Sequence, residues 1–321
     1  MKVKELSIED LEPLEFIDEK VKEITSIVGE NVAVNAMSGG VDSSTVTMLA
    51  HRALGKNLKT YFIDSGLMRE GEPENVASIF RRLGVSIEIV EAKDVFFNNL
   101  KGVEDPEEKR NVITNVFYKK VFGRILKEQN AHFLFHGTNF TDVEETVAGI
   151  KRQHNILEQL GTDPEKEYGY KVLEPLVRIR KTGVRMVAEA LGLPENVYNR
   201  MPFPGPALAA RVIGEVTPEK VNIVRKATKV VEEELHETKA FQYLAILHQD
   251  KVTGMRNNKR AFGNQIEVRC WDSRDAVIGS PTRLPYDTLE RIADQITSEI
   301  PEVVSVTYNI TKKPPSTIEA I

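Results

Sequence analysis

Short apolar runs alternate with amphipathic stretches over the first two thirds of the sequence. The runs predict strands at 32–37, 59–64, 85–91, 132–138 and 171–176, and the stretches between them predict helices at 42–54, 72–83, 106–129 and 181–192. Strands that are apolar throughout and alternate with helices indicate a parallel sheet covered on both faces. Ligands bind beyond the carboxyl ends of the strands in such sheets, so we expect functional residues directly after them.

The pattern changes after residues 199–215, where Pro202, Pro204 and Pro206 cannot continue a helix or a central strand. Beyond them the sequence predicts a long helix near 217–236, strands within 243–249, 264–271 and 303–311, and a helix near 285–299. We therefore expect an α/β domain with a parallel sheet over 1–200, followed by a smaller α+β domain over 201–321.

Composition excludes several classes of protein. The 321 residues are 41% apolar and 28% charged with a net charge of −5, which is ordinary for a globular protein and gives no general attraction to nucleic acid or to a membrane surface. No apolar run approaches the roughly 18 residues of a membrane span, and the N-terminus lacks the apolar core of a signal peptide. We expect a cytoplasmic protein without nucleic-acid or membrane partners.

The single cysteine, Cys270, excludes an internal disulfide and a zinc site built from cysteines. It lies in a predicted strand, so we expect a buried structural thiol rather than a nucleophile.

Residues 38–44, which read S-G-G-V-D-S-S, join the first predicted strand to its helix. Two glycines allow a tight turn with exposed N–H groups, and the helix N-terminus adds positive potential, so the segment suits phosphate or pyrophosphate. It has neither the lysine of a Walker A loop nor the glycine spacing of a dinucleotide loop. Asp42 would repel phosphates unless a cation lay between them, which predicts Mg²⁺ at Asp42. The alternative is a tight turn in which Asp42 caps the helix.

The pattern S-G-G-x-D-S is typical of the ATP pyrophosphatases, or PP-loop family, which cleave ATP to AMP and pyrophosphate. Further segments narrow the resemblance, and they occur in a fixed order: 62–72, 100–110, 136–142, 172–176, 199–220 and 312–321. Over nearly its whole length the chain resembles the ATP-pyrophosphatase subunit of GMP synthases, most closely the separate archaeal-type subunit.

This resemblance implies a PP-loop domain related to the adenine-nucleotide alpha hydrolases, ATP and Mg²⁺ as cofactors, and a homodimer formed through the C-terminal domain. It also implies a reaction in which ATP adenylylates XMP at the purine 2-oxygen and ammonia then displaces AMP to give GMP. A glutaminase needs an activated cysteine, and Cys270 lies in no such context. Either a separate glutaminase subunit or free ammonia would therefore supply the nitrogen, and the resemblance implies the glutaminase subunit as a partner.

The resemblance also assigns residues by their positions in the motifs. Asp42 and Lys151 would be catalytic, with Asp42 as the metal ligand. The ATP-binding residues would be Ser38, Gly39, Gly40, Val41, Asp42, Ser43, Ser44, Asp64, Ser65, Gly66, Gly137 and Thr138. The substrate-binding residues would be Asp142, His154, Arg211, Lys313 and Glu319.

The sequence departs from the family pattern in several substrate segments. A lid that usually reads K-S-H-H-N is here residues 151–155 with one histidine, Ala207 replaces a glycine in the proline turn, and segment 253–260 lacks the usual acid. The tail ends in Ala320 and Ile321 instead of an aromatic residue and an acid. Two alternatives follow: a paralogue that adenylylates and then aminates or thiolates another nucleotide or heterocycle, and a non-catalytic nucleotide-binding regulatory subunit. The intact loop with Asp42 argues against the second.

Overall fold

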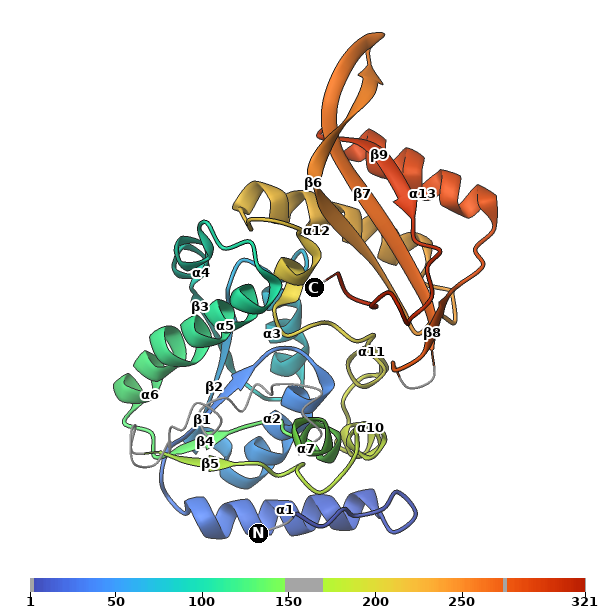
Figure 1. Cartoon of the computed structure of the whole chain (residues 1–321). Helices are drawn as coiled ribbons and strands as arrows, with labels where there is room; N and C mark the ends of the chain where they lie inside the picture. Colours follow the sequence, from blue (N-terminus) through green and yellow to red (C-terminus); the bar gives the residue numbers. More distant parts are fainter. Residues whose placement is uncertain (1–2, 148–169, 274–275, 321) are drawn as a thin grey trace. The chain divides into compact units, whose positions relative to one another are not determined.

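A computed structural model describes residues 3–147, 170–273 and 276–320 of the chain (Figure 1). Contacts between residues group the chain into two compact units. The first holds Met1–Asp64, Glu72–Ala92 and Thr114–Arg200. The second holds Ser65–Gly71, Lys93–Ile113 and Met201–Ile321.

The first unit contains a five-stranded sheet in the order β3-β2-β1-β4-β5, with every neighbouring pair parallel. Its strands are β1 (Ala33–Met37), β2 (Leu58–Asp64), β3 (Ile87–Glu91), β4 (Phe133–Phe135) and β5 (Lys171–Leu173). Helices α2 (Val41–Leu54), α3 (Glu72–Arg82) and α10 (Lys181–Ala190) lie where the sequence predicts them. The prediction of a parallel sheet alternating with helices is therefore confirmed.

The burial of the strands follows their place in the sheet. In the central strand β1, Ala33, Val34 and Met37 are buried, whereas the edge strand β3 has only half-buried and exposed side chains. The core of the unit therefore lies around β1, β2 and the helices that cover them.

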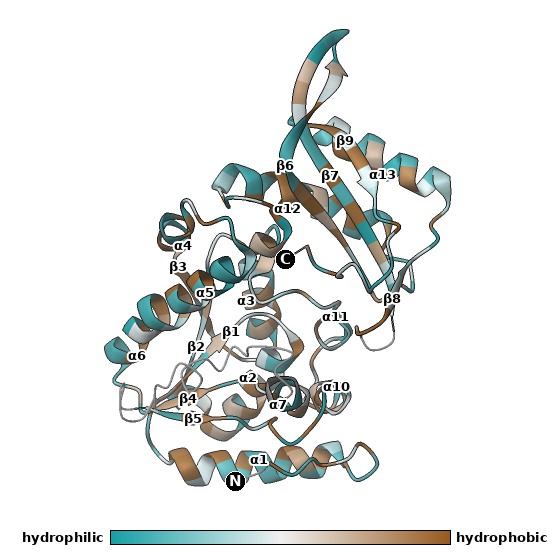
Figure 2. Ribbon diagram, viewed as in Figure 1, coloured by the Kyte–Doolittle hydropathy of each residue, from teal (hydrophilic) through white to brown (hydrophobic). Residues whose placement is uncertain are grey.

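Helix α1 (Pro13–Val28) precedes the sheet and was not predicted. Pro13 occupies its first turn, where a missing N–H costs nothing. Hydrophobic and hydrophilic residues are interleaved along the helix (Figure 2), and its buried face includes Phe16, Ile17 and Ile24. This face contacts α2 and α10. The proline and the helical spacing of these apolar residues were the available signals.

The long helix predicted over 106–129 is present but irregular. It consists of α5 (Pro106–Asn115), a π-helical segment η2 (Val116–Phe122) and α6 (Gly123–Gln129). The sequence places Ile113, Phe117, Val121 and Ile125 at steps of four along this helix; Ile113, Val121 and Ile125 are buried and Phe117 is half-buried. A π-helical turn takes up more residues than an α-helical turn and so rotates the side chains that follow. Despite this irregularity, three of these four apolar residues are buried.

The second unit contains the predicted mixture of helices and strands. Strands β6 (Gln242–Arg256) and β7 (Lys259–Ser273) form a long hairpin, β8 (Gly279–Pro281) pairs antiparallel with β7, and β9 (Val303–Tyr308) pairs parallel with β7. Asn257 and Asn258 both have positive φ at the hairpin turn, which suits the twist of the strands. Figure 2 shows hydrophilic residues at this end of the hairpin.

A helix cap and a buried thiol are two local features of the second unit, and the thiol confirms the prediction for Cys270. Thr217 caps α12 (Pro218–Glu234), because its side-chain oxygen accepts a hydrogen bond from the Lys220 N–H. Cys270 is buried in β7, and burial raises the pKa of its thiol.

The remaining elements are short, apart from α13. They are η1 (Gly55–Asn57), α4 (Lys93–Leu100), α7 (Phe140–Val147), α11 (Glu195–Tyr198), η3 (Ala207–Arg211) and α13 (Tyr286–Glu299). None of the helices within the described ranges is both long and apolar enough to cross a membrane.

Ala207 opens η3 with a φ of 54°, a left-handed conformation that favours glycine. Replacing Ala207 with glycine relieves this strain but removes a buried methyl group, so we expect the free energy of unfolding to stay level or rise. The matched change Ala209→Gly, in the same turn, removes a buried methyl group and adds chain entropy without such relief. We expect Ala209→Gly to be less stable than Ala207→Gly by about 1 kcal/mol in denaturant titrations. Equal losses in the two variants would contradict this account.

Candidate nucleotide-binding site

The glycine loop, residues 38–44, links the end of β1 to the start of α2. Gly39 has a φ of 78°, and a Cβ atom there would lie 2.9 Å from Cγ2 of Val76, so this position requires glycine. The hydroxyl of Ser43 donates to the Gly40 carbonyl at 3.0 Å and lies 3.1 Å from the hydroxyl of Ser38. The loop therefore wraps tightly around the N-terminus of α2, where backbone N–H groups and helix potential favour an anion.

The strand order places this loop at the switch point of the sheet, which is the place where the order of the strands reverses. Strand β1 lies between β2 and β4, so the segments that follow β1 and β4 diverge from a common place. A Cβ atom on Gly137 would lie 3.2 Å from both Cβ of Asp42 and N of Ser43. The turn after β4 therefore packs directly against the glycine loop, as the sequence predicts for residues that follow strands.

Asp42 is the second residue of α2, and its carboxylate is engaged with other side chains. Gly40 is the N-cap residue, so Asp42 does not cap the helix. Its carboxylate pairs with the ammonium group of Lys181 and accepts a hydrogen bond from the Asn139 side-chain amide at 3.5 Å. Lys181 was missed by the sequence analysis. Its position at the first turn of the helix after β5 was the available signal.

The carboxylate of Asp42 fits one way of binding Mg²⁺. Among the described residues, no three or more His, Cys, Asp or Glu side chains are grouped so that they could hold a metal ion. However, Mg²⁺ is commonly bound by one or two carboxylates together with phosphate oxygens and water. A single carboxylate in the first turn of α2, beside a loop that suits phosphate, fits that mode, in which the ion arrives with the nucleotide.

A chain of hydrogen bonds supports the turn after β4. The Thr138 hydroxyl donates to the Glu174 carboxylate at 2.5 Å, and it lies 2.9 Å from Nδ1 of His136. Since the hydroxyl proton of Thr138 is directed to Glu174, Nδ1 of His136 is the donor to Thr138. Nε2 of the same ring then accepts from the Tyr118 hydroxyl at 2.8 Å. His136 is therefore neutral, and burial lowers its pKa to about 4.

The depressed pKa of His136 predicts a stability loss in mild acid. Its unfolded value is about 6.5, so the unfolded chain binds a proton between pH 6.5 and 4 that the folded chain excludes. The contribution of His136 to the free energy of unfolding is therefore fully present above pH 6.5, and it falls by a few kcal/mol as the pH drops to 4. We expect His136→Gln to remove this part of the pH dependence in denaturant titrations at pH 7 and pH 4.5. An identical pH dependence in the variant would contradict the assignment.

Asp64, Ser65 and Gly66 lie at the carboxyl end of β2 and directly after it. Asp64 is buried at the end of β2, and its carbonyl accepts from the Ala92 N–H at 2.9 Å. In the second unit, Ser65 accepts a hydrogen bond from the Leu67 N–H, and Gly66 has a φ of 74°. A Cβ atom on Gly66 would lie 2.8 Å from the Phe97 ring, so this position also requires glycine.

Asp142 has a local structural role at the start of α7. Its carboxylate accepts from the Asn139 N–H at 3.1 Å, and the Asn139 side chain accepts from the Asp142 N–H at 3.2 Å. This reciprocal pair is a capping box.

In the second unit, the structure brings Arg211 and Glu319 together. Arg211 is wholly buried and donates through Nε and Nη2 to the Glu319 carboxylate, both at 3.2 Å. Gln242 donates to the same carboxylate at 2.6 Å. Lys313 donates to the Ala276 carbonyl at 2.6 Å.

The segment around Glu319 is packed against the second unit. Ile318 is buried in a cluster with Leu244, Ile246 and Trp271. Lys151 and His154 lie outside the described residues.

Comparison with known families agrees with this arrangement. Residues 11–117 match the NAD synthase family, and residues 228–320 match the GMP synthase C terminal domain. The parallel sheet, the glycine loop at its switch point and the match over 11–117 define the class of the protein: a nucleotide-binding α/β protein of the PP-loop type.

Three relatives cover nearly the whole chain. The chain is 49% identical to the B subunit of the glutamine-hydrolyzing GMP synthase of Archaeoglobus fulgidus over 95% of its own length and 98% of that protein. It is 49% identical to the corresponding protein of Thermococcus kodakarensis over 95% of this chain and 98% of that protein. It is 45% identical to the corresponding protein of Methanopyrus kandleri over 96% of this chain and 99% of that protein. The chain belongs to the family of GMP synthase B subunits, which confirms the resemblance predicted from its motifs.

Among solved structures, the chain is similar to an NH3-dependent NAD synthetase from Campylobacter jejuni in complex with the nitrate ion. The TM-score is 0.47 at 16% identity, covering 71% of this chain and 86% of that chain.

Proposed function

We propose that this chain catalyses the ATP-dependent amination of XMP to GMP. The purine 2-oxygen of XMP attacks the α-phosphorus of ATP, the bond to the β-phosphate oxygen breaks, and pyrophosphate leaves. Ammonia then adds to C2, the bond from C2 to the adenylyl oxygen breaks, and AMP leaves as the attacking nitrogen loses a proton. The observation that carries this proposal is the glycine loop with Asp42 at the switch point of the sheet, in a chain whose relatives are GMP synthase subunits over nearly their full length.

The residues around the loop suit phosphoryl chemistry, which depends on positioning and charge neutralisation more than on a nucleophile. In this proposal the N–H groups of residues 38–44 hold the departing pyrophosphate. Asp42 would hold Mg²⁺, which when bound neutralises charge on the phosphates. Lys181 adds a cation beside Asp42, and Lys151, which lies outside the described residues, would supply a second one.

The remaining predicted residues would bind XMP: Asp142, His154, Arg211, Lys313 and Glu319. The contacts of Glu319 support a fixed acceptor, because Arg211 and Gln242 both hold its carboxylate. Such an acceptor could bind a purine N–H, and losing a polar contact of this kind costs about 1–3 kcal/mol.

We propose that residues 1–200 bind ATP and that residues 201–321 form a homodimer and bind the substrate nucleotide. Ammonia would come from a separate glutaminase subunit, which the names of the relatives support. The burial of Cys270 supports the same assignment, since an activated thiol needs access and a depressed pKa. We place the enzyme in the cytoplasm.

The test is one assay that contains the protein, MgATP, XMP and an ammonium salt. We expect GMP, AMP and pyrophosphate in equal amounts. Omitting XMP, or replacing it with IMP, should stop AMP formation, since IMP has no 2-oxygen to adenylylate. Replacing ammonium with glutamine should stop GMP formation until a glutaminase subunit is added. AMP formation that requires an acceptor other than XMP would favour the paralogue, and no pyrophosphate with any acceptor would favour a regulatory subunit.

A further inference from the structure

Glu72 and Arg200 form an ion pair, and each of them is a residue at which the chain enters or leaves the first unit. The path of the chain passes from one unit to the other between Gly71 and Glu72 and again between Arg200 and Met201, so each member of the pair adjoins a junction. We propose that this pair is a clamp that positions the glycine loop for ATP. Both residues are then positioning residues, since they act through Gly39. This inference rests on the proposed function, which supplies ATP as the ligand of the loop.

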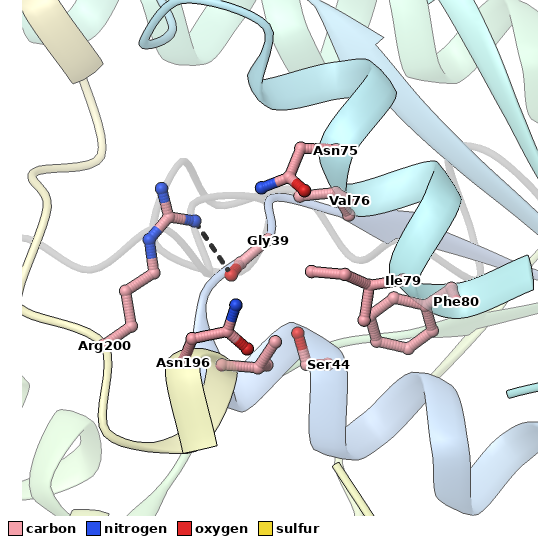
Figure 3. A pocket seen from close by; sticks show the side chains of 9 residues that line it. Gly39, Ser44, Asn75, Val76, Ile79, Phe80, Asn196 and Arg200 are labelled. Atoms are coloured by element: carbon pink, nitrogen blue, oxygen red, sulfur yellow. Dashed lines mark hydrogen bonds between the residues drawn. The ribbon is translucent and has the colours of Figure 1, made fainter. Parts of the chain in front are cut away.

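A single guanidinium group makes both contacts of the clamp. Nη2 of Arg200 lies 2.7 Å from Oε1 of Glu72, whose side chain is only 4% exposed. Nη1 of Arg200 donates to the Gly39 carbonyl at 3.2 Å, the bond drawn in Figure 3. Glu72 thus fixes the guanidinium, and the guanidinium fixes a carbonyl within the loop.

The orientation of that carbonyl decides where the next N–H group points. In a trans peptide, the C=O of Gly39 and the N–H of Gly40 point in opposite directions. Because Arg200 binds the carbonyl on one side, the Gly40 N–H faces the other side, where it approaches the Ser38 hydroxyl at 3.4 Å. Glycine at 39 offers little resistance to a peptide flip, so this orientation depends on the contact from Arg200.

A cavity beside the clamp shows why the contact matters. It has a volume of about 100 Å³, and Gly39, Ser44, Asn196 and Arg200 are among its lining residues. Figure 3 shows Asn75, Val76, Ile79 and Phe80 of α3 on its other wall. Since Arg200 lines this open cavity, packing surrounds its side chain only in part. Its polar contacts to Glu72 and Gly39 determine its place.

Three variants separate loop positioning from charge balance. Arg200→Met removes the donor to Gly39 and leaves the buried Glu72 carboxylate without this partner, so we expect weaker MgATP binding and a lower Tm. Glu72→Gln keeps a hydrogen-bond acceptor for Arg200, so we expect a smaller loss of binding than in Arg200→Met. The double variant removes both charges of this pair, so its Tm should recover, while MgATP binding stays weak because Gly39 still lacks its donor.

The measurement is the Kd for MgATP by calorimetry in the absence of XMP, together with the KM for XMP at saturating ATP. We expect Arg200→Met and the double variant to raise the Kd for MgATP about tenfold, the effect of losing a hydrogen bond from a charged group, with little change in the KM for XMP. The control is Arg124→Met, which breaks an exposed ion pair with Glu128 and should leave the Kd unchanged.

Two outcomes would overturn the clamp: a wild-type Kd for MgATP in Arg200→Met, or recovery of both Tm and Kd in the double variant. Failure of the proposed function looks different, because it shows in the wild-type protein. In that case the wild-type protein does not bind MgATP at all, or it binds MgATP but does not aminate XMP.

Discussion

Replacing Asp42 with asparagine should lower the rate of XMP-dependent pyrophosphate release by about 10²- to 10³-fold, the order of magnitude for losing one preorganised electrostatic group in an active site. The loss would arise because asparagine is a much weaker ligand for the Mg²⁺ that we propose to accompany ATP. The fold should survive, since the Asp42 side chain is 23% exposed and its partner Lys181 is 44% exposed and can be solvated. The measurement is steady-state pyrophosphate release with MgATP, XMP and ammonium.

The control for this prediction is Asp18→Asn. Asp18 is exposed on α1 and is not one of the predicted site residues, so this variant removes one negative charge outside the glycine loop. We expect wild-type turnover in the control and a similar Tm in both variants. Unchanged turnover in Asp42→Asn would remove the role of Asp42 as a metal ligand.

The second large effect is on stability. Replacing Arg211 with alanine should lower the free energy of unfolding of the second unit by about 3–5 kcal/mol, because it breaks a buried ion pair and leaves Glu319 largely desolvated. The single tryptophan reports this transition, since Trp271 is buried in the same unit within the cluster that contains Ile318. Denaturant unfolding followed by tryptophan fluorescence is the measurement.

Two further variants test the cause of this loss. Arg211→Met combined with Glu319→Gln removes both charges at similar volume, so we expect it to recover most of the lost stability. Arg291→Met breaks a more exposed pair with Glu234 and should cost at most about 1 kcal/mol. If Arg211→Ala kept full stability and lost only XMP binding, the buried pair would have no structural role.

Local patterns were sufficient to predict much of the fold. The strands at 33–37 and 58–64 are mostly apolar and mostly buried because they lie inside a parallel sheet, and their run length distinguishes them from helices. The turn after β1 could be predicted because a conformation with a φ of 78° demands glycine at 39. The cap at Thr217 is a local signal as well.

Contacts between distant residues could not be predicted in this way. Asp42 and Lys181 are 139 residues apart, and Gly39 and Arg200 are 161 apart, and periodicity says nothing about partners at such separations. The sequence therefore identified the loop but not the two cations beside it. The π-helical segment at 116–122 was not predicted either, because the apolar spacing of residues 106–129 is that of a regular helix.

The most direct test of the central claim is a crystal structure of the protein with a non-hydrolysable ATP analogue and Mg²⁺. We expect the β- and γ-phosphates within hydrogen-bonding distance of backbone N–H groups of residues 38–44, with the ion bound between a phosphate oxygen and the Asp42 carboxylate. Density for the triphosphate at any other place, with the turn after β1 unoccupied at saturating nucleotide, would contradict the account.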